Sequence, residues 1–257
     1  MKVSVWNNLK THVADRELSA IIHDIKNGTV KEEVIALRQL LYVGKKSQYD
    51  EQKKNLLSFT TSGTFNGRRK LSHLKEYNGC IILDIDNLAP VLLQQAEIQA
   101  RECPYTYACF ISPGAEGLKI IVRTNATPET HKVTFGALAT YYENYLNIFV
   151  DPSGKDIPRL CLFSFHPDTY LNEESNLFNP ENIIQMETRK VNNDPAALFQ
   201  HCKRFTDKKK TYSEGSRNNY VHLLACNCNR RGLTQEETLY FTCERFDLAS
   251  DEVKAIV

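Results

Sequence analysis

The chain has 257 residues, 42% of them hydrophobic, which is enough for one large domain or for a domain and a small module. A formal net charge of +1 argues neither for nor against a nucleic-acid partner, so any basic surface has to be local. No stretch approaches the roughly 18 apolar residues of a membrane span, and the N-terminus lacks the pattern of a signal peptide. We therefore expect a cytoplasmic protein that binds no membrane, with its eight cysteines reduced and mostly buried.

The first segment predicts a strand followed by two amphipathic helices. Residues 3–6 are expected to form a short strand. Apolar residues then recur at helical spacing over 15–26 and again over 30–43. Each of these patterns is followed by a glycine, Gly28 or Gly44, where we expect the helix to end.

A β-prone segment follows at 57–65, and a cationic turn comes directly after it. Ser62 and Thr64 are small hydroxyl residues, and Arg68 and Arg69 add positive charge. Hydroxyl groups beside guanidinium groups suit a phosphate or a polynucleotide backbone. The alternative is a hairpin with a solvated basic turn, and the pattern alone favours it.

The most informative stretch is the apolar run 81–83 with the two aspartates that follow it. Side chains repeat every two residues along a strand, so Asp84 and Asp86 share a face, with Cα atoms about 6.6 Å apart. Two carboxylates at this spacing can converge on a divalent cation, and hard oxygen ligands suit Mg²⁺ or Mn²⁺. The alternative is a strand end at which aspartate and asparagine simply turn the chain.

A helix over 88–102 and two strands, 105–111 and 118–123, are predicted next. The strands are joined by a turn that contains Ser112, Gly114 and Gly117. Backbone N–H groups of such a turn, together with the Ser112 hydroxyl and the Lys119 ammonium, can meet an anion. An ordinary hairpin with a surface lysine is the alternative.

Thr127 and Pro128 predict the start of a further helix, as the N-cap and the first helical residue. A short strand over 148–150 is expected to end at Asp151, a third acidic residue at an apolar strand end. Arg159 then precedes an apolar strand predicted over 160–165.

The last third of the chain predicts a linker and a small helical module. Composition shifts to Asn, Glu and Pro from residue 172, and the charged run at 207–210 indicates a hinge or, as the favoured alternative, a solvated loop. Helices are predicted over 216–230 and after Thr234, which forms a capping-box pattern with Glu237. The chain ends near Ile256 inside a third helical pattern, so we expect it to be a fragment of a longer protein.

Together the motifs resemble a known family, over about Val3 to Asn172. The residues that carry the resemblance are 62–65 with Arg68, 83–86, 112–119 and the segment from Asp151 through Arg159 to Asp168. They look like the VirE N-terminal-like domain of mobile-element proteins, which is similar to the archaeo-eukaryotic primase–polymerase superfamily. Residues 215–218 and the helices after them resemble the helical module that follows such primase domains.

The resemblance implies an α/β (α+β) fold, in which a mixed sheet with an RRM-like core and flanking helices precedes a small C-terminal helical module. We expect the primase–polymerase-like domain at 1–172, a linker or peripheral segment at 173–193 and a helical primase C-terminal-like module at 194–257.

The resemblance also implies a metal-dependent nucleotidyltransferase, a DNA primase or polymerase that acts in the replication of a mobile element. Its cofactor would be Mg²⁺ or Mn²⁺, as two ions, and its partners would be a nucleoside triphosphate, single-stranded or primed DNA template and a helicase domain or protein. The implied catalytic metal ligands are Asp84, Asp86 and Asp151. The implied nucleotide contacts are Ser112, Gly114, Gly117, Lys119 and Arg159, and the implied nucleic-acid contacts are Ser62, Thr64, Arg68 and Arg69. The family has histidine where this chain has Lys119.

Three other functions remain open. A non-catalytic nucleic-acid-binding module on the same fold would bind without metal, and the Lys119 departure suits it. A metal-dependent nuclease would use the same three carboxylates and need no nucleoside triphosphate. A structural accessory protein would have solvated aspartates at its strand ends.

Overall fold

The computed structural model describes residues 1–181, 195–213, 215, 217–230, 232–246 and 248–254. The chain divides into two compact units, Met1–Ile184 and Gln185–Val257, and each is described by itself. Within the described ranges, no helix has the length and apolar character needed to cross a membrane.

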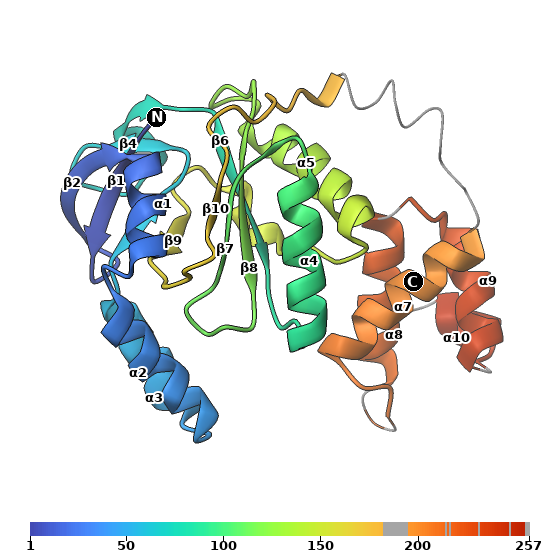
Figure 1. Ribbon diagram of the computed structural model, residues 1–257. Helices are drawn as coiled ribbons and strands as arrows, with labels where there is room; N and C mark the ends of the chain where they lie inside the picture. The colour runs from blue at the N-terminus through green and yellow to red at the C-terminus, as the bar shows by residue number, and fades with distance from the viewer. Residues whose placement is uncertain (182–194, 214, 216, 231, 247, 255–257) are drawn as a thin grey trace. The chain divides into compact units, whose positions relative to one another are not determined.

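Two antiparallel four-stranded sheets form the framework of the first unit (Figure 1). One sheet has the order β2-β1-β3-β9, with β1 at Lys2–Asn7, β2 at Thr11–Glu17, β3 at Ser58–Thr60 and β9 at Leu160–Leu162. The other has the order β10-β7-β8-β6, with β6 at Cys80–Ile85, β7 at Thr106–Ile111, β8 at Leu118–Arg123 and β10 at Tyr170–Leu171. Strands β4 (Gly63–Phe65) and β5 (Leu74–Tyr77) pair separately.

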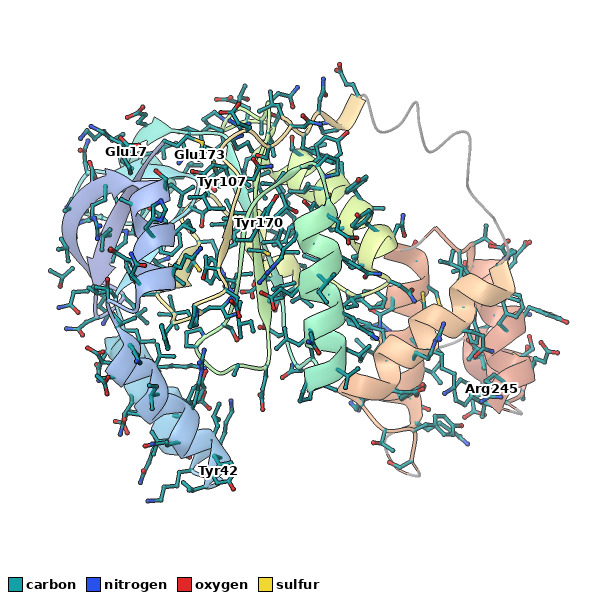
Figure 2. All side chains as sticks on the ribbon, viewed as in Figure 1. Glu17, Tyr42, Tyr107, Tyr170, Glu173 and Arg245 are labelled. Atoms are coloured by element: carbon teal, nitrogen blue, oxygen red, sulfur yellow. The ribbon has the colours of Figure 1, made fainter. Side chains whose placement is uncertain are left out.

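Helices cover both faces of the second sheet. Helices α4 (Pro90–Glu102) and α5 (His131–Leu146) pack on one face, and α1 (Leu18–Asn27) packs on the other. Helices α2 (Lys31–Tyr42) and α3 (Lys46–Gln52) form a pair at one end of the unit, where Tyr42 is exposed (Figure 2). Short 3₁₀ turns occur at Lys53–Asn55, Leu71–His73 and Pro152–Lys155.

The alternation of side chains along β6 decides which residues enter which core. Ile81, Leu83 and Ile85 join the cluster under α4 and α5. Cys80 and Ile82 point to the opposite face and join the cluster around α1. Successive side chains of a strand alternate between faces, so Asp84 lies on the α1 side of this sheet.

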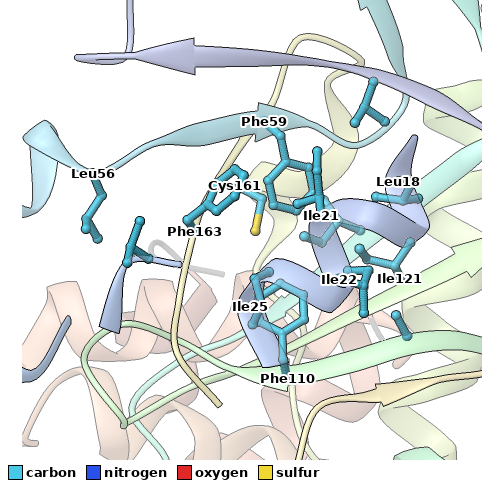
Figure 3. Close-up of a cluster of buried hydrophobic side chains, with 14 of the residues drawn as sticks. Leu18, Ile21, Ile22, Ile25, Leu56, Phe59, Phe110, Ile121, Cys161 and Phe163 are labelled. Carbon is cyan, nitrogen blue, oxygen red and sulfur yellow. The ribbon is translucent and has the colours of Figure 1, made fainter. Parts of the chain in front are cut away.

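The cluster around α1 joins the two sheets (Figure 3). Ile21 and Ile25 of α1 are fully buried, as the helical spacing of its apolar residues predicts. Phe59 and Phe163 meet edge to face beside them, with ring centroids 5.7 Å apart. The space between the sheets is therefore filled by side chains at this level.

The second unit consists of helices with a small apolar core of its own. Its described elements are α7 (Pro195–Lys209), α8 (Arg217–Arg230), α9 (Gln235–Phe246) and α10 (Ser250–Lys254). Phe199, Tyr220 and Leu224 are fully buried in that core. The capping box is formed, because the Glu237 N–H donates to Thr234 Oγ1 and the Thr234 N–H donates to Glu237 Oε2.

The mixed α/β fold class predicted from the sequence is confirmed. The strand at 3–6, the helices at 30–43 and 88–102, and the strands at 81–83, 105–111 and 118–123 are also confirmed to within two residues. Gly28 ends α1 in the left-handed conformation, at φ 85°. The starting residue 216 and the final residues near Ile256 lie outside the described part of the chain.

Four local predictions were wrong. Residues 15–17 belong to β2, because the turn at Asn8 and Leu9 returns the chain along β1. Helix α5 begins at His131 rather than after Thr127, since Thr127 and Thr130 bond to each other ahead of it. The strand predicted at 148–150 is absent from the assigned elements, all of which lie in the described residues. The expected hinge or loop at 207–210 continues α7, where Asp207 accepts a hydrogen bond from Tyr220 in α8.

The predicted linker at 173–193 lies partly outside the described residues, which resume at 195. Its first part packs into the first unit. Phe178 is fully buried against Tyr105 and Tyr141, and its backbone bridges to Thr124.

The buried imidazole of His131 predicts a loss of stability in acid. Burial lowers its pKa to about 4, and Nδ1 is hydrogen-bonded to the Tyr77 hydroxyl at 2.8 Å. The unfolded chain therefore binds more protons below about pH 6.5, and stability is lost as pH falls toward 4. We expect the free energy of unfolding of wild type to fall by about 2–3 kcal/mol more than that of His131→Gln between pH 7.5 and pH 4.5, measured by urea denaturation.

His23→Gln is the matched control, because His23 lies exposed on α1. An equal pH dependence in wild type and His131→Gln would contradict the role given to His131.

Candidate functional site

The antiparallel register of β6 and β8 places an acid directly opposite a base. Asp84 pairs with Lys119 across the two strands, and the next pair is Ile85 with Leu118. Directly opposite residues have Cβ atoms about 5 Å apart, which lets a lysine reach the carboxylate of its partner. The Lys119 ammonium contacts Asp84 Oδ1 and lies 3.6 Å from Asp86 Oδ1.

Both side chains of the Asp84–Lys119 pair are largely shielded from water. Their side chains are 12% and 13% exposed, whereas that of Asp86 is 46% exposed. Arg159 adds a second cation, with Nη2 3.7 Å from Asp84 Oδ2. Burial lowers the pKa of Lys119 to about 8, with Arg159 adding to the decrease and Asp151 opposing it. The ammonium is therefore still mostly protonated at pH 7 and forms an ion pair with Asp84.

Asp151 reaches the same place from a different part of the chain. Its backbone N–H donates to the Asp84 carbonyl oxygen at 2.7 Å. Its own Oδ1 accepts the Ser153 N–H at 2.7 Å and caps the 3₁₀ turn Pro152–Lys155. The third acidic residue predicted from the sequence thus lies next to the first, although the segment before it is no strand of the sheet.

The turn between β7 and β8 closes one side of this group of charges. The Ser112 N–H donates to the Gly117 carbonyl at 2.8 Å, and the Ala115 N–H donates to the Ser112 carbonyl at 2.9 Å. A Cβ on Gly117 would lie 2.7 Å from the Ile85 carbonyl oxygen, 3.0 Å from Asp86 Oδ1 and 3.2 Å from Ser112 Oγ. Only glycine fits there without displacing Asp86 and Ser112.

Two residues that the sequence did not single out support this turn. Arg38 of α2 donates to the carbonyls of Pro113, Phe165 and Ser112 at 3.2, 2.9 and 3.5 Å. Tyr49 of α3 faces Gly114, where a Cβ would lie 2.8 Å from its hydroxyl. Burial raises the pKa of Tyr49, and the nearby Asp86 carboxylate contributes. The sequence carries no signal for the role of Arg38, because its partners lie 74 to 127 residues away in the chain.

The predicted nucleic-acid residues fall into two groups. The side chains of Ser62 and Thr64 are buried, at 4% and 1% exposed. Arg68 is exposed, and Arg69 donates to the Pro158 carbonyl at 2.8 Å. Burial lowers the pKa of Arg69, and the neighbouring Arg159 adds to the effect. The structure therefore brings Arg69 and Arg159 together, whereas Ser62 and Thr64 are buried and cannot contact a nucleic acid in this conformation.

The donors at the centre of the site fit one hard cation. The Lys119 ammonium, itself a cation, contacts Asp84 and lies 3.6 Å from Asp86. Carboxylate oxygens such as these are also the ligands that Mg²⁺ and Mn²⁺ prefer. A three-ligand set is not formed: among the residues that the structure describes, no three His, Cys, Asp or Glu side chains are grouped to hold a metal ion. Asp84 and Asp86 fit a single divalent ion only in the place that Lys119 now takes.

These features define an α/β domain with a compact charged site at the ends of neighbouring strands. In a comparison with family models, residues 51–171 match the model of the BT4734-like, N-terminal domain. The match covers every site residue predicted from the sequence, from Ser62 to Arg159, but neither Arg38 nor Tyr49. Comparisons with curated proteins and with solved structures gave no match.

Arg38→Ala removes the only described side chain that donates to three carbonyls around the turn. We expect the free energy of unfolding to fall by about 2–3 kcal/mol, because the carbonyls of Ser112, Pro113 and Phe165 lose a charged donor. Urea denaturation measures the change. The matched control is Arg16→Ala, since Arg16 forms a partly exposed pair with Asp24 and its loss should cost about 1 kcal/mol or less. Equal losses in the two variants would show that Arg38 does not support the turn.

Proposed function

We propose that the first unit is a primase–polymerase-type domain that binds a nucleoside triphosphate and acts as a nucleotidyltransferase in the replication of a mobile element. One observation carries the proposal. The strand-end acids Asp84 and Asp86, a buried lysine and a glycine turn meet at one point, within the stretch that matches the BT4734-like N-terminal domain. This combination supports the resemblance to the VirE N-terminal-like and primase–polymerase families on geometry as well as on sequence.

The residues of the site divide into anion-binding and cation-binding groups. Lys119 and Arg159 supply positive charge for a triphosphate, and the Ser112–Gly117 turn offers backbone N–H groups and a hydroxyl. Arg69 lies near Arg159, and together with its exposed neighbour Arg68 it would contact the backbone of a template. Phosphoryl transfer asks mostly for positioning and charge neutralisation, which a site of acids and cations can supply.

Asp84 and Asp86, with Asp151 beside them, would hold a divalent ion, Mg²⁺ or Mn²⁺. Such an ion supplies charge neutralisation at the reacting phosphate oxygens. The chain's own contribution is to place the carboxylates on a rigid strand and to exclude water from Asp84.

A second candidate is a nucleic-acid-binding module that performs no catalysis. The Lys119–Asp84 ion pair favours it, because the pair neutralises the site without a metal. In this function Arg68, Arg69 and Arg159 would contact the phosphate backbone, and binding would weaken with salt but not depend on metal. For the second unit, a role as the helical module that follows primase domains remains part of the proposal.

The test is binding of a labelled nucleoside triphosphate with and without Mn²⁺, in wild type and in a variant carrying Asp84→Ala and Asp86→Ala. We expect binding to require Mn²⁺ and to weaken at least about tenfold in the variant, because the charges that hold the ion are gone. Extension of a primed template should be lost in the same variant.

A double variant of Glu32→Ala and Glu33→Ala is the matched control, since it removes two adjacent exposed acids from α2. Absence of triphosphate binding in wild type, with or without Mn²⁺, would contradict the proposal. Metal-independent binding of single-stranded DNA in that case would favour the second candidate.

A further inference from the structure

Lys119 takes the position of a metal ion between the two acids of the site. It is the direct cross-strand partner of Asp84, and its ammonium contacts Asp84 while lying 3.6 Å from Asp86. The pair is fixed by the ladder of β6 and β8, which runs without a register shift from Cys80 to Ile85. The contact is therefore set by the backbone and not by the chance rotamer of a surface side chain.

The charges of the site are already nearly balanced without a metal. Asp84, Asp86 and Asp151 contribute three negative charges, and Lys119 and Arg159 contribute two positive charges close to them. The Asp84 and Lys119 side chains are 12% and 13% exposed, so their attraction is little screened by water. A divalent ion that entered here would meet two cations and would leave the Lys119 ammonium buried without its partner, which is costly.

We propose that Lys119 is an internal counter-cation that competes with divalent metal for Asp84 and Asp86. The site binds metal only when the ammonium leaves Asp84, so metal entry is coupled to movement of Lys119. The inference rests on the proposed function only in taking these two acids as metal ligands, and it deepens that function by assigning regulation of metal binding to Lys119. A triphosphate, as a polyanion, is the class of ligand that would draw the ammonium away.

The test uses Mn²⁺ alone, without nucleotide, titrated calorimetrically into the full chain. We expect weak binding in wild type and at least about tenfold tighter binding in Lys119→Met, because the competing charge is removed. The gain should disappear when Asp84→Asn is added to Lys119→Met. Lys75→Met is the matched control: it removes the same charge from another lysine–aspartate pair, that of Lys75 with Asp15 at 3.1 Å, and should leave Mn²⁺ binding unchanged.

A second variant and a second measurement cover the case in which Lys119→Met folds poorly. Lys119→Gln removes the charge and keeps a polar side chain with a hydrogen-bond donor, on a shorter stem. The thermal unfolding midpoint of either variant should rise on addition of Mn²⁺ more than that of wild type does, since an ion that binds the folded state stabilises it.

Equal Mn²⁺ affinity in wild type and both variants, or no Mn²⁺ binding in any of them, would overturn the inference. A gain that survives Asp84→Asn would overturn it as well. These outcomes are separate from those of the proposed function. Tighter Mn²⁺ binding in Lys119→Met without triphosphate binding in wild type would leave the inference standing and contradict the proposed function. Primer extension by wild type, together with equal Mn²⁺ affinity in wild type and Lys119→Met, would support the proposed function and contradict the inference.

Discussion

The ion pair between Asp84 and Lys119 is the constraint on which the site depends. A buried pair is stable only while both charges remain, because removal of either leaves an uncompensated charge in a poorly solvated place. The pair also joins the edge strand β6 to the inner strand β8, at the level where the apolar cluster around α1 gives way to charged side chains. Asp86, the Ser112–Gly117 turn and Arg159 are arranged around it. Asp84 and Lys119 therefore matter both for the stability of this region and for the proposed chemistry.

Much of the fold could be predicted from the period of apolar residues. Strands β6, β7 and β8 and helices α2 and α4 bury enough apolar side chains to give clear patterns. Strand β2 could not be predicted, since none of its residues is fully buried and its pairing with β1 comes from the backbone. Helix α7 was obscured by its charged end, where Asp207 pairs with Lys203 one turn earlier and accepts a hydrogen bond from Tyr220 of α8.

The site was predictable where its residues belong to short motifs of the sequence, and it was not where they lie on the N-terminal helices. The spacing of Asp84 and Asp86 and the glycine turn with Lys119 identified residues that do lie together. The sequence could not show that Lys119 stands opposite Asp84, because strand register is a property of the folded sheet. Nor could it show the buried state of Ser62 and Thr64 or the role of Arg38, which depend on segments far apart in the chain.

The most direct test of this account is a double-mutant cycle on the free energy of unfolding, with Asp84→Asn, Lys119→Met and the two combined. We expect each single change to lower the free energy of unfolding by about 3–5 kcal/mol, and the double variant to lower it by at least about 2 kcal/mol less than their sum. Such coupling would establish the buried ion pair as the centre of the site. Additive effects, within about 0.5 kcal/mol, would contradict it and show that Asp84 and Lys119 do not depend on each other.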